Sequence, residues 1–197
     1  MGDVRERFDL VDRHRRYDRR LYEKVMSQDP RLVLNYATPE AKRLYRMQRN
    51  VLCSLHLKKG FMRLERSKHG ILYAKTRLEH RVADLLLSHF HNRFPTFHIA
   101  IEDGSMTYAI SPSGRMTEHT LPVEEVVRRL ESKLPVDPLL EGLEFDGRLW
   151  EGFYDSQYIS ERRNIKLMNK MMPLKHRDKN AMETRKAKGG HRITDYI

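Results

Sequence analysis

The chain has 197 residues, of which 38 are Lys or Arg and 27 are Asp or Glu, and its formal net charge at pH 7 is +11. This length suits one domain of ordinary size with extensions, or at most two small domains, and it can bury a core without cross-links. The positive excess favours a polyanionic partner, which means DNA, RNA or an acidic membrane surface, although a basic protein without such a partner is the alternative.

The single cysteine, Cys53, excludes an intramolecular disulfide framework. Its neighbours in residues 51–55 are mostly apolar, which predicts a buried structural thiol rather than a nucleophile. No apolar run is long enough to cross a bilayer, and the first twenty residues carry charges of both signs without a signal-peptide core. We therefore expect a cytoplasmic protein with no membrane partner.

Apolar residues recur at helical spacing over residues 4–26, which predicts one amphipathic helix with an arginine-rich outer face. That face is equally consistent with solvated surface and with a basic arm. A second helix is predicted to begin near residue 38, with Thr38 as its N-cap and Pro39 as its first helical residue. In this helix the arginines share one exposed side by their three-residue spacing: Arg43, Arg46 and Arg49.

After Gly60 the hydrophobic period changes from helical to alternating, which indicates strands. The predicted elements that follow are a hairpin over residues 61–66 and 71–74, a helix over 79–92, strands over 97–102, 106–111 and 115–120, and a helix over 123–133. A loop rich in proline and glycine comes next, and then helices between residues 149 and 172 that Pro173 ends. The basic tail beyond is expected to be disordered without a partner.

This order predicts an α+β fold, with a mainly antiparallel sheet of four to five strands covered by helices. Because the strands arrive in hairpins, the sheet is not expected to be doubly wound. The predicted organisation is an N-terminal basic helical extension over residues 1–37, the α+β core over 38–173, and a basic flexible tail over 174–197.

Several segments together resemble a family named domain of unknown function 4130. The segments are Leu57-Lys58-Lys59-Gly60-Phe61-Met62-Arg63-Leu64, Gly70-Ile71-Leu72-Tyr73-Ala74, Glu79-His80, His89-Phe90, Arg93-Phe94-Pro95, Leu149-Trp150-Glu151-Gly152-Phe153-Tyr154, Glu161-Arg162-Arg163-Asn164, Leu167-Met168 and Met171-Met172-Pro173. The resemblance spans about residues 40 to 173. After Pro173 this chain departs from the family, which continues there with an aromatic-rich segment.

The resemblance implies a setting in DNA metabolism. Family members are described as DNA-metabolism proteins, some fused to a uracil-DNA-glycosylase-like domain and others paired with a radical-SAM protein assigned to DNA repair. A DNA-repair enzyme is therefore a possible protein partner for this chain. The resemblance implies no mechanism.

Three groups of basic or amide side chains are predicted to bind nucleic acid. The first lies on one predicted helix and is made of Arg162, Arg163, Asn164, Lys166 and Lys170. The second lies at the helix-to-hairpin junction and is made of Lys58, Lys59 and Arg63. The third is the tail, with Lys175, Arg177, Lys179, Arg185, Lys186 and Lys188. Such cations neutralise phosphates but carry no sequence specificity by themselves; a solvated face paired with Glu161 or Asp155 is the alternative for the first group.

Metal-binding and catalytic interpretations rest on weaker patterns. The histidines at positions 80, 89, 91 and 98 lack the spacing of a zinc site, so no metal or other cofactor is predicted. An enzyme acting on a nucleobase or nucleotide would use Glu79, His80 and Asp84 as acid–base groups. Glu79 equally suits a helix N-terminus, where the macrodipole favours an acid.

The main hypothesis is an accessory nucleic-acid-binding protein, placed in DNA repair or DNA metabolism by the resemblance. A protein that binds structured RNA or the ribosome is the first alternative. An enzyme centred on Glu79 and His80 is the second, and the sequence leans away from it because it contains no complete catalytic motif.

Overall fold

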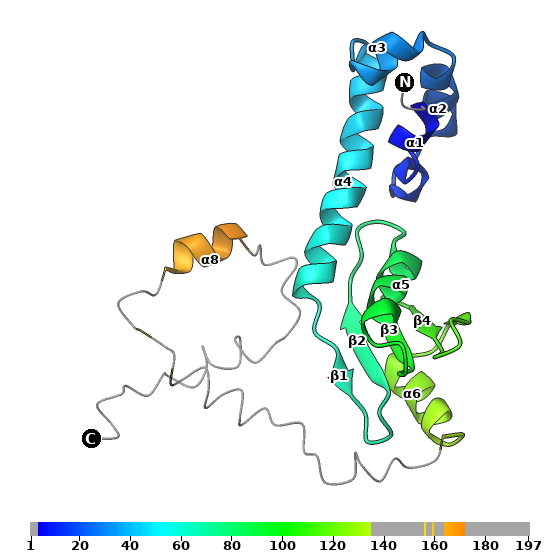
Figure 1. The fold of residues 1–197 in the computed structure, drawn as a ribbon, viewed down its shortest axis with the longest axis vertical. Helices are drawn as coiled ribbons and strands as arrows, with labels where there is room; N and C mark the ends of the chain where they lie inside the picture. Colours follow the sequence, from blue (N-terminus) through cyan, green and yellow to red (C-terminus); the bar gives the residue numbers. More distant parts are fainter. Residues whose placement is uncertain (1–3, 135–155, 157–158, 160–163, 172–197) are drawn as a thin grey trace.

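The structure is a computed structural model, and it describes residues 4–134, 156, 159 and 164–171. The helical elements are α1 Val4–Arg7, the 3-10 turn η1 Val11–Arg13, α2 Arg19–Met26, α3 Pro30–Leu34, α4 Pro39–Phe61, α5 Ala83–Arg93, α6 Val123–Glu131 and α8 Ile165–Met171 (Figure 1). The strands are β1 Glu65–Arg66, β2 Leu72–Thr76, β3 Ile99–Asp103, β4 Met106–Ile110 and β5 Met116–His119. The tail and most of the region predicted as helices between residues 149 and 172 lie outside the described residues.

The five strands form one sheet in the order β1-β2-β3-β4-β5, which confirms the predicted mainly antiparallel α+β fold. β2 and β3 are parallel, with Ala74 opposite Ile101, whereas the other neighbours are antiparallel. Parallel neighbours need a crossover connection, and α5 supplies it. The sequence order of hairpins and helices did not predict this parallel pair.

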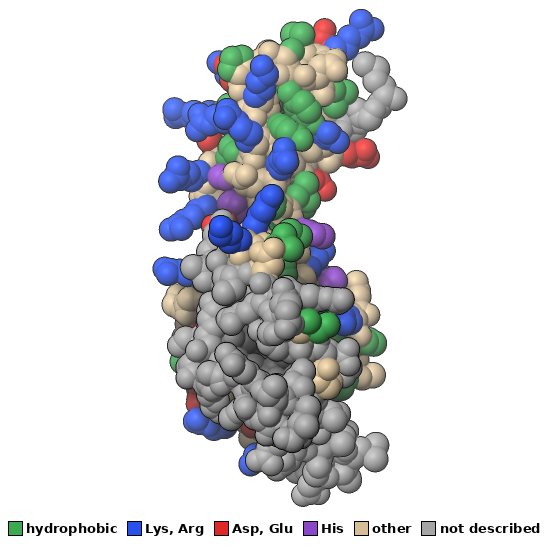
Figure 2. Space-filling model, turned by 90° about the vertical axis from the view of Figure 1, so that its left-hand side faces the viewer, with side chains coloured by type: hydrophobic (Ala, Val, Ile, Leu, Met, Phe, Trp, Pro, Cys, Tyr) green, Lys and Arg blue, Asp and Glu red, His purple; other side chains and the backbone are tan. Residues whose placement is uncertain are grey.

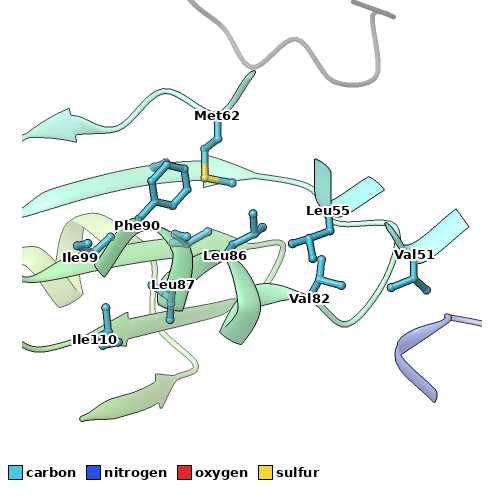
Figure 3. Close-up of a cluster of buried hydrophobic side chains, with 11 residues drawn as sticks. Val51, Leu55, Met62, Val82, Leu86, Leu87, Phe90, Ile99 and Ile110 are labelled. Carbon is cyan, nitrogen blue, oxygen red and sulfur yellow. The ribbon is translucent and has the colours of Figure 1, made fainter. Parts of the chain in front are cut away.

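Helices cover both faces of the sheet. On one face, side chains from α4 and α5 meet the strands in a cluster that includes Leu55, Leu86, Phe90 and Ile99, and Figure 3 shows these residues pointing toward one another. On the other face, the valines of α6 pack on the remaining inward positions: Val123, Val126 and Val127 against Ile71, Ala100 and Ala109. Successive strand residues alternate between the two clusters, as the two-residue period of a strand requires.

The N-terminal region is not the single helix predicted over residues 4–26. It forms α1, η1 and α2, with extended backbone at His14 and Asp18 between the last two. The Asp18 carboxylate accepts hydrogen bonds from the backbone N–H groups of Arg20 and Leu21, so a new helix starts there. These side-chain hydrogen bonds take the place of the backbone hydrogen bonds that a continuous helix would form here, which explains the break.

This N-terminal region packs on the first half of α4 (Figure 1). Its apolar side chains form a second buried cluster: Phe8, Val11, Leu21, Val25 and Val33 with Ala41, Leu44 and Met47 of α4. The buried Gln48 joins the two parts, because its amide oxygen accepts from the Leu10 backbone at 3.2 Å and its nitrogen donates to Asp9 at 2.8 Å.

The helix α4 begins as predicted and ends later than predicted. Thr38 Oγ1 accepts from the Ala41 backbone at 3.2 Å, and Pro39 is the first helical residue, which confirms the predicted cap. The helix then continues through Gly60 to Phe61, so the first hairpin strand is only Glu65–Arg66. Among the described helices, none is both long and apolar enough to cross a membrane.

We predict that Leu86→Ala lowers the free energy of unfolding by about 2–5 kcal/mol, because a fully buried leucine leaves a cavity between α5 and the sheet. Leu52→Ala is the control, since Leu52 lies on a helix at 46% exposure and its change is expected to cost under about 0.5 kcal/mol. Urea unfolding followed by circular dichroism measures both. Equal losses for the two variants would contradict the assigned core.

Candidate nucleic-acid interface

The helix α4 has a buried side and an exposed side. Its buried residues recur at helical spacing: Ala41, Leu44, Met47, Gln48, Val51, Ser54, Leu55 and Lys58. At about 100° per residue these positions occupy one half of the helix circumference. The opposite half carries the exposed residues Lys42, Arg43, Arg46, Arg49, Asn50, Leu52, Cys53, His56 and Gly60. We call this second set the outer face of α4.

The outer face carries positive charge without local acids. Lys42, Arg46 and Arg49 are exposed near its centre line, and Arg43 is exposed at its border. No Asp or Glu occurs between residues 41 and 64 of the sequence. Figure 2 shows Lys and Arg side chains gathered over the upper part of the molecule, where α4 lies. No acid therefore lies within one turn of Arg46 or Arg49, and Glu40 is the acid one turn before Arg43.

The nearest acid on the helix already has a partner. Glu40 accepts a hydrogen bond from Lys24 of α2 at 2.6 Å, and this bond is the main reason that the pKa of Glu40 lies below its usual value. Within the described residues, none of Lys42, Arg43, Arg46 and Arg49 forms an ion pair. No described ion pair therefore has to break before these charges contact an external anion.

Elsewhere on the described surface, several cations are paired. Arg19 binds Glu23 at 2.8 Å, Lys75 binds Glu124 at 2.6 Å, and Arg128 and Arg129 both bind Glu125. Exposed pairs of this kind add little stability but they do neutralise charge locally. The contrast distinguishes the outer face of α4, with its three arginines, from α6, whose two exposed arginines are both paired.

The second predicted group of cations is only partly at the surface. Arg63 is exposed and Lys59 is half-buried. Lys58 is 2% exposed, and its ammonium donates a hydrogen bond to Thr76 at the end of β2, so its prediction as a surface contact was wrong. The reason is helical period, because Lys58 follows Val51, Ser54 and Leu55 on the buried side of α4.

The structure describes only some residues of the first predicted group of nucleic-acid contacts. Lys166 and Lys170 of α8 are exposed. Asn164 is exposed too, and its side-chain oxygen accepts from the Leu167 backbone at 2.8 Å, as a helix cap does. Arg162 and Arg163 lie outside the described residues. The same holds for the predicted tail contacts Lys175, Arg177, Lys179, Arg185, Lys186 and Lys188.

Cys53 is exposed, so the prediction of a buried thiol was wrong. It follows Arg49 by four residues and Arg46 by seven, which places it on the outer face of α4. The apolar neighbours Val51 and Leu55 are buried, but their side of the helix is the opposite one. The helical period already present in the sequence could have predicted this placement.

The acid–base candidates lie where the N-terminal region meets the start of α5. Asp84 forms an ion pair with Arg13 at 2.9 Å, and His80 Nδ1 accepts from the Arg15 backbone at 3.4 Å. The rings of His80 and His14 lie 4.6 Å apart. Glu79 precedes α5, which begins at Ala83 rather than at residue 79. These contacts join two parts of the fold, and a catalytic role for the three residues stays a prediction.

Burial is the main reason that three of the described histidines, His14, His89 and His98, have a pKa below the usual value. Burial, and then the nearby charge of Arg16, lower the pKa of His14 below its usual value. Burial, followed by Lys59 and Arg93, lowers the pKa of His89, and burial alone lowers that of His98. Across the described ranges, no three His, Cys, Asp or Glu side chains come together as a metal site.

Comparison with known proteins gives one match. The family model "Domain of unknown function (DUF4130)" matches residues 13–183. This match is wider than the resemblance over about residues 40 to 173, because it includes α2, α3 and part of the tail. No curated protein and no solved structure matches the chain.

We predict that acid destabilises the fold in part through His14. Its lowered pKa means that the folded state disfavours the imidazolium, so the stabilisation is present above its ordinary pKa of about 6.5 and is lost as pH falls toward the folded value. Urea unfolding at pH 7, 6 and 5 should therefore show a shallower loss for His14→Asn than for the parent protein. His56→Asn, at an exposed position of α4, is the control, and a slope for His14→Asn equal to the parental one would refute the assignment.

Proposed function

The chain belongs to the family of domain of unknown function DUF4130, and we propose that it is an accessory nucleic-acid-binding protein whose contact surface is the outer face of α4. One observation supports the proposal most: four exposed cations share a helix segment without acids and, among the described residues, have no ion-pair partner. Exposed cations that are not held in an ion pair can replace the counterions that surround a phosphate backbone.

The energetics favour a polyanion because little has to be broken on the protein. Among the described residues, Arg46 and Arg49 have no ion pair to give up when they contact a polyanion, whereas Arg128 and Arg129 would first have to leave Glu125. The release of condensed counterions then drives association, and affinity falls steeply as salt rises. The net charge of +11 adds long-range attraction.

A membrane surface fits the outer face less well than a nucleic acid does. An interfacial helix binds by inserting an apolar face among the lipids. The apolar side of α4 is buried in two hydrophobic clusters, and Leu52 is the large apolar residue exposed on the outer face. The remaining exposed side chains there are polar or charged, or are small, which suits a solvated phosphate backbone.

The biological setting comes from the family resemblance, which favours DNA repair or DNA metabolism, in the cytoplasm, with a DNA-repair enzyme as a possible partner. Structured RNA, including the ribosome, is the competing ligand. The predicted contacts at Arg162, Arg163, Lys166 and Lys170 and in the tail would add phosphate contacts to those of α4. They would raise affinity without selecting a sequence.

We predict that the double variant Arg46→Gln with Arg49→Gln weakens nucleic-acid binding about tenfold or more at low salt, because it removes two cations from the centre of the contact surface. Glutamine is chosen because its helix propensity is close to that of arginine. The double variant Arg128→Gln with Arg129→Gln removes the same net charge from α6 and should change affinity little, because those arginines are paired with Glu125.

Fluorescence anisotropy with labelled DNA and RNA at two salt concentrations measures all three proteins. Circular dichroism confirms that each variant keeps its helices. Equal weakening by the two double variants would mean that only net charge matters, and it would remove α4 as the contact surface. Absence of binding to any nucleic acid at low salt would overturn the proposed function.

A further inference from the structure

We propose that the outer face of α4 binds in the major groove of B-form duplex DNA, so that the protein prefers duplex DNA to single-stranded DNA and to double-stranded RNA. This inference rests on the proposed function, which by itself requires only a nucleic acid of some kind. Three properties of the outer face support it: its shape, the placement of its charges, and the kind of side chain that it lacks.

The shape of the outer face suits a groove. From Lys42 to His56 it runs for about 21 Å along a regular helix, at about 1.5 Å per residue. Half of the circumference is exposed along this length. The major groove of B-form DNA is about 12 Å wide and admits an α-helix, whereas the major groove of A-form RNA is too deep and narrow for protein side chains to read.

The rest of the described fold leaves this side of α4 open. The N-terminal helices α1, α2 and α3 pack on the buried side of its first half, and Figure 1 draws α1 and α2 beside α4 and α3 over its upper end. Figure 2, in which the left-hand side of Figure 1 faces the viewer, shows basic side chains standing out over the upper part of the molecule. A duplex can therefore approach the segment from Lys42 to Arg49 without meeting α1, α2 or α3.

The charges of the outer face are distributed as a groove-binding helix needs them. At about 100° per residue, Arg46 and Arg49 lie within about 40° of the centre line, where a bound helix faces the base edges. Arg43 and Lys59 lie near its opposite borders, where the two phosphate backbones would run. Arginine can bind guanine O6 and N7 with two hydrogen bonds, and Asn50, also exposed, can bind adenine in the same way.

The outer face also lacks the side chains that bind single strands. Proteins that hold single-stranded nucleic acid stack its bases on aromatic rings. None of the exposed α4 residues between Lys42 and Gly60 is Phe, Tyr or Trp. Tyr45, the nearest aromatic side chain, is half-buried with its ring 4.1 Å from that of Tyr36. Among the exposed α4 residues, His56 carries the one aromatic ring, so the outer face offers mainly charge and hydrogen bonds.

The first test compares affinities of the full chain for a short DNA duplex, one of its single strands, and an RNA duplex of the same sequence. Fluorescence anisotropy at one fixed salt concentration should give at least about tenfold tighter binding to duplex DNA. Single-stranded DNA or duplex RNA binding as tightly as duplex DNA would overturn this inference but leave the proposed function standing. Binding to none of the three would refute both.

The second test asks which groove is occupied. Dimethyl sulfate methylates guanine N7, an atom of the major groove, so the bound protein should protect it and Arg46→Gln with Arg49→Gln should abolish the protection. Cys53, the single cysteine of the sequence, reports the protein side, because duplex DNA should slow its alkylation by a maleimide.

A relocated thiol controls the second test. In Cys53→Ser with Ser132→Cys, the reporter lies at the exposed end of α6, and duplex DNA should leave its alkylation rate unchanged. Unprotected N7 in a saturated complex whose Cys53 is shielded would place α4 on the phosphate backbone outside the major groove. That result would reject the groove inference while supporting α4 as the contact surface.

Discussion

The burial of one side of α4 is the constraint on which the rest of the structure depends. The first half of the helix contributes Ala41, Leu44 and Met47 to the N-terminal cluster, and the second half contributes Val51 and Leu55 to the cluster above the sheet. A rotation of the helix about its axis would expose both sets to water, at roughly 1.5–3 kcal/mol for each large apolar side chain. This packing therefore also fixes the direction in which Arg46 and Arg49 point.

Electrostatics then distinguishes this surface from others with similar composition. Both α4 and α6 present arginines to solvent, but α6 carries Glu125 within one turn of Arg128 and Arg129, whereas α4 has no acid within one turn of Arg46 or Arg49. The one acid in the first turn of α4, Glu40, bonds to Lys24 of α2. The packing of the N-terminal region on α4 thus keeps the acid of α4 that is nearest in sequence to the basic segment engaged with a cation of another helix.

Much of this arrangement follows from sequence periodicity, and the differences have physical causes. The Thr38 cap and the exposed arginine spacing are local properties, so they could be predicted. The burial of Lys58 and the exposure of Cys53 were missed because each was judged by its neighbours in sequence instead of by its side of the helix. The parallel pairing of β2 with β3 depends on where α5 packs, which is a tertiary effect. The break at Asp18 follows from capping competing with helix propagation.

The hydrogen bond from Lys58 to Thr76 has a mechanical consequence. Apolar contacts oppose the rotation of a helix about its axis. They oppose its translation along that axis less, because one apolar side chain can take the place of the next in a non-directional contact. An ammonium at 2% exposure cannot slide in this way, since it would leave its oxygen partner and remain desolvated. The last turn of α4 is thereby held in axial register with the end of β2, which fixes the height above the sheet of the arginines two to three turns away.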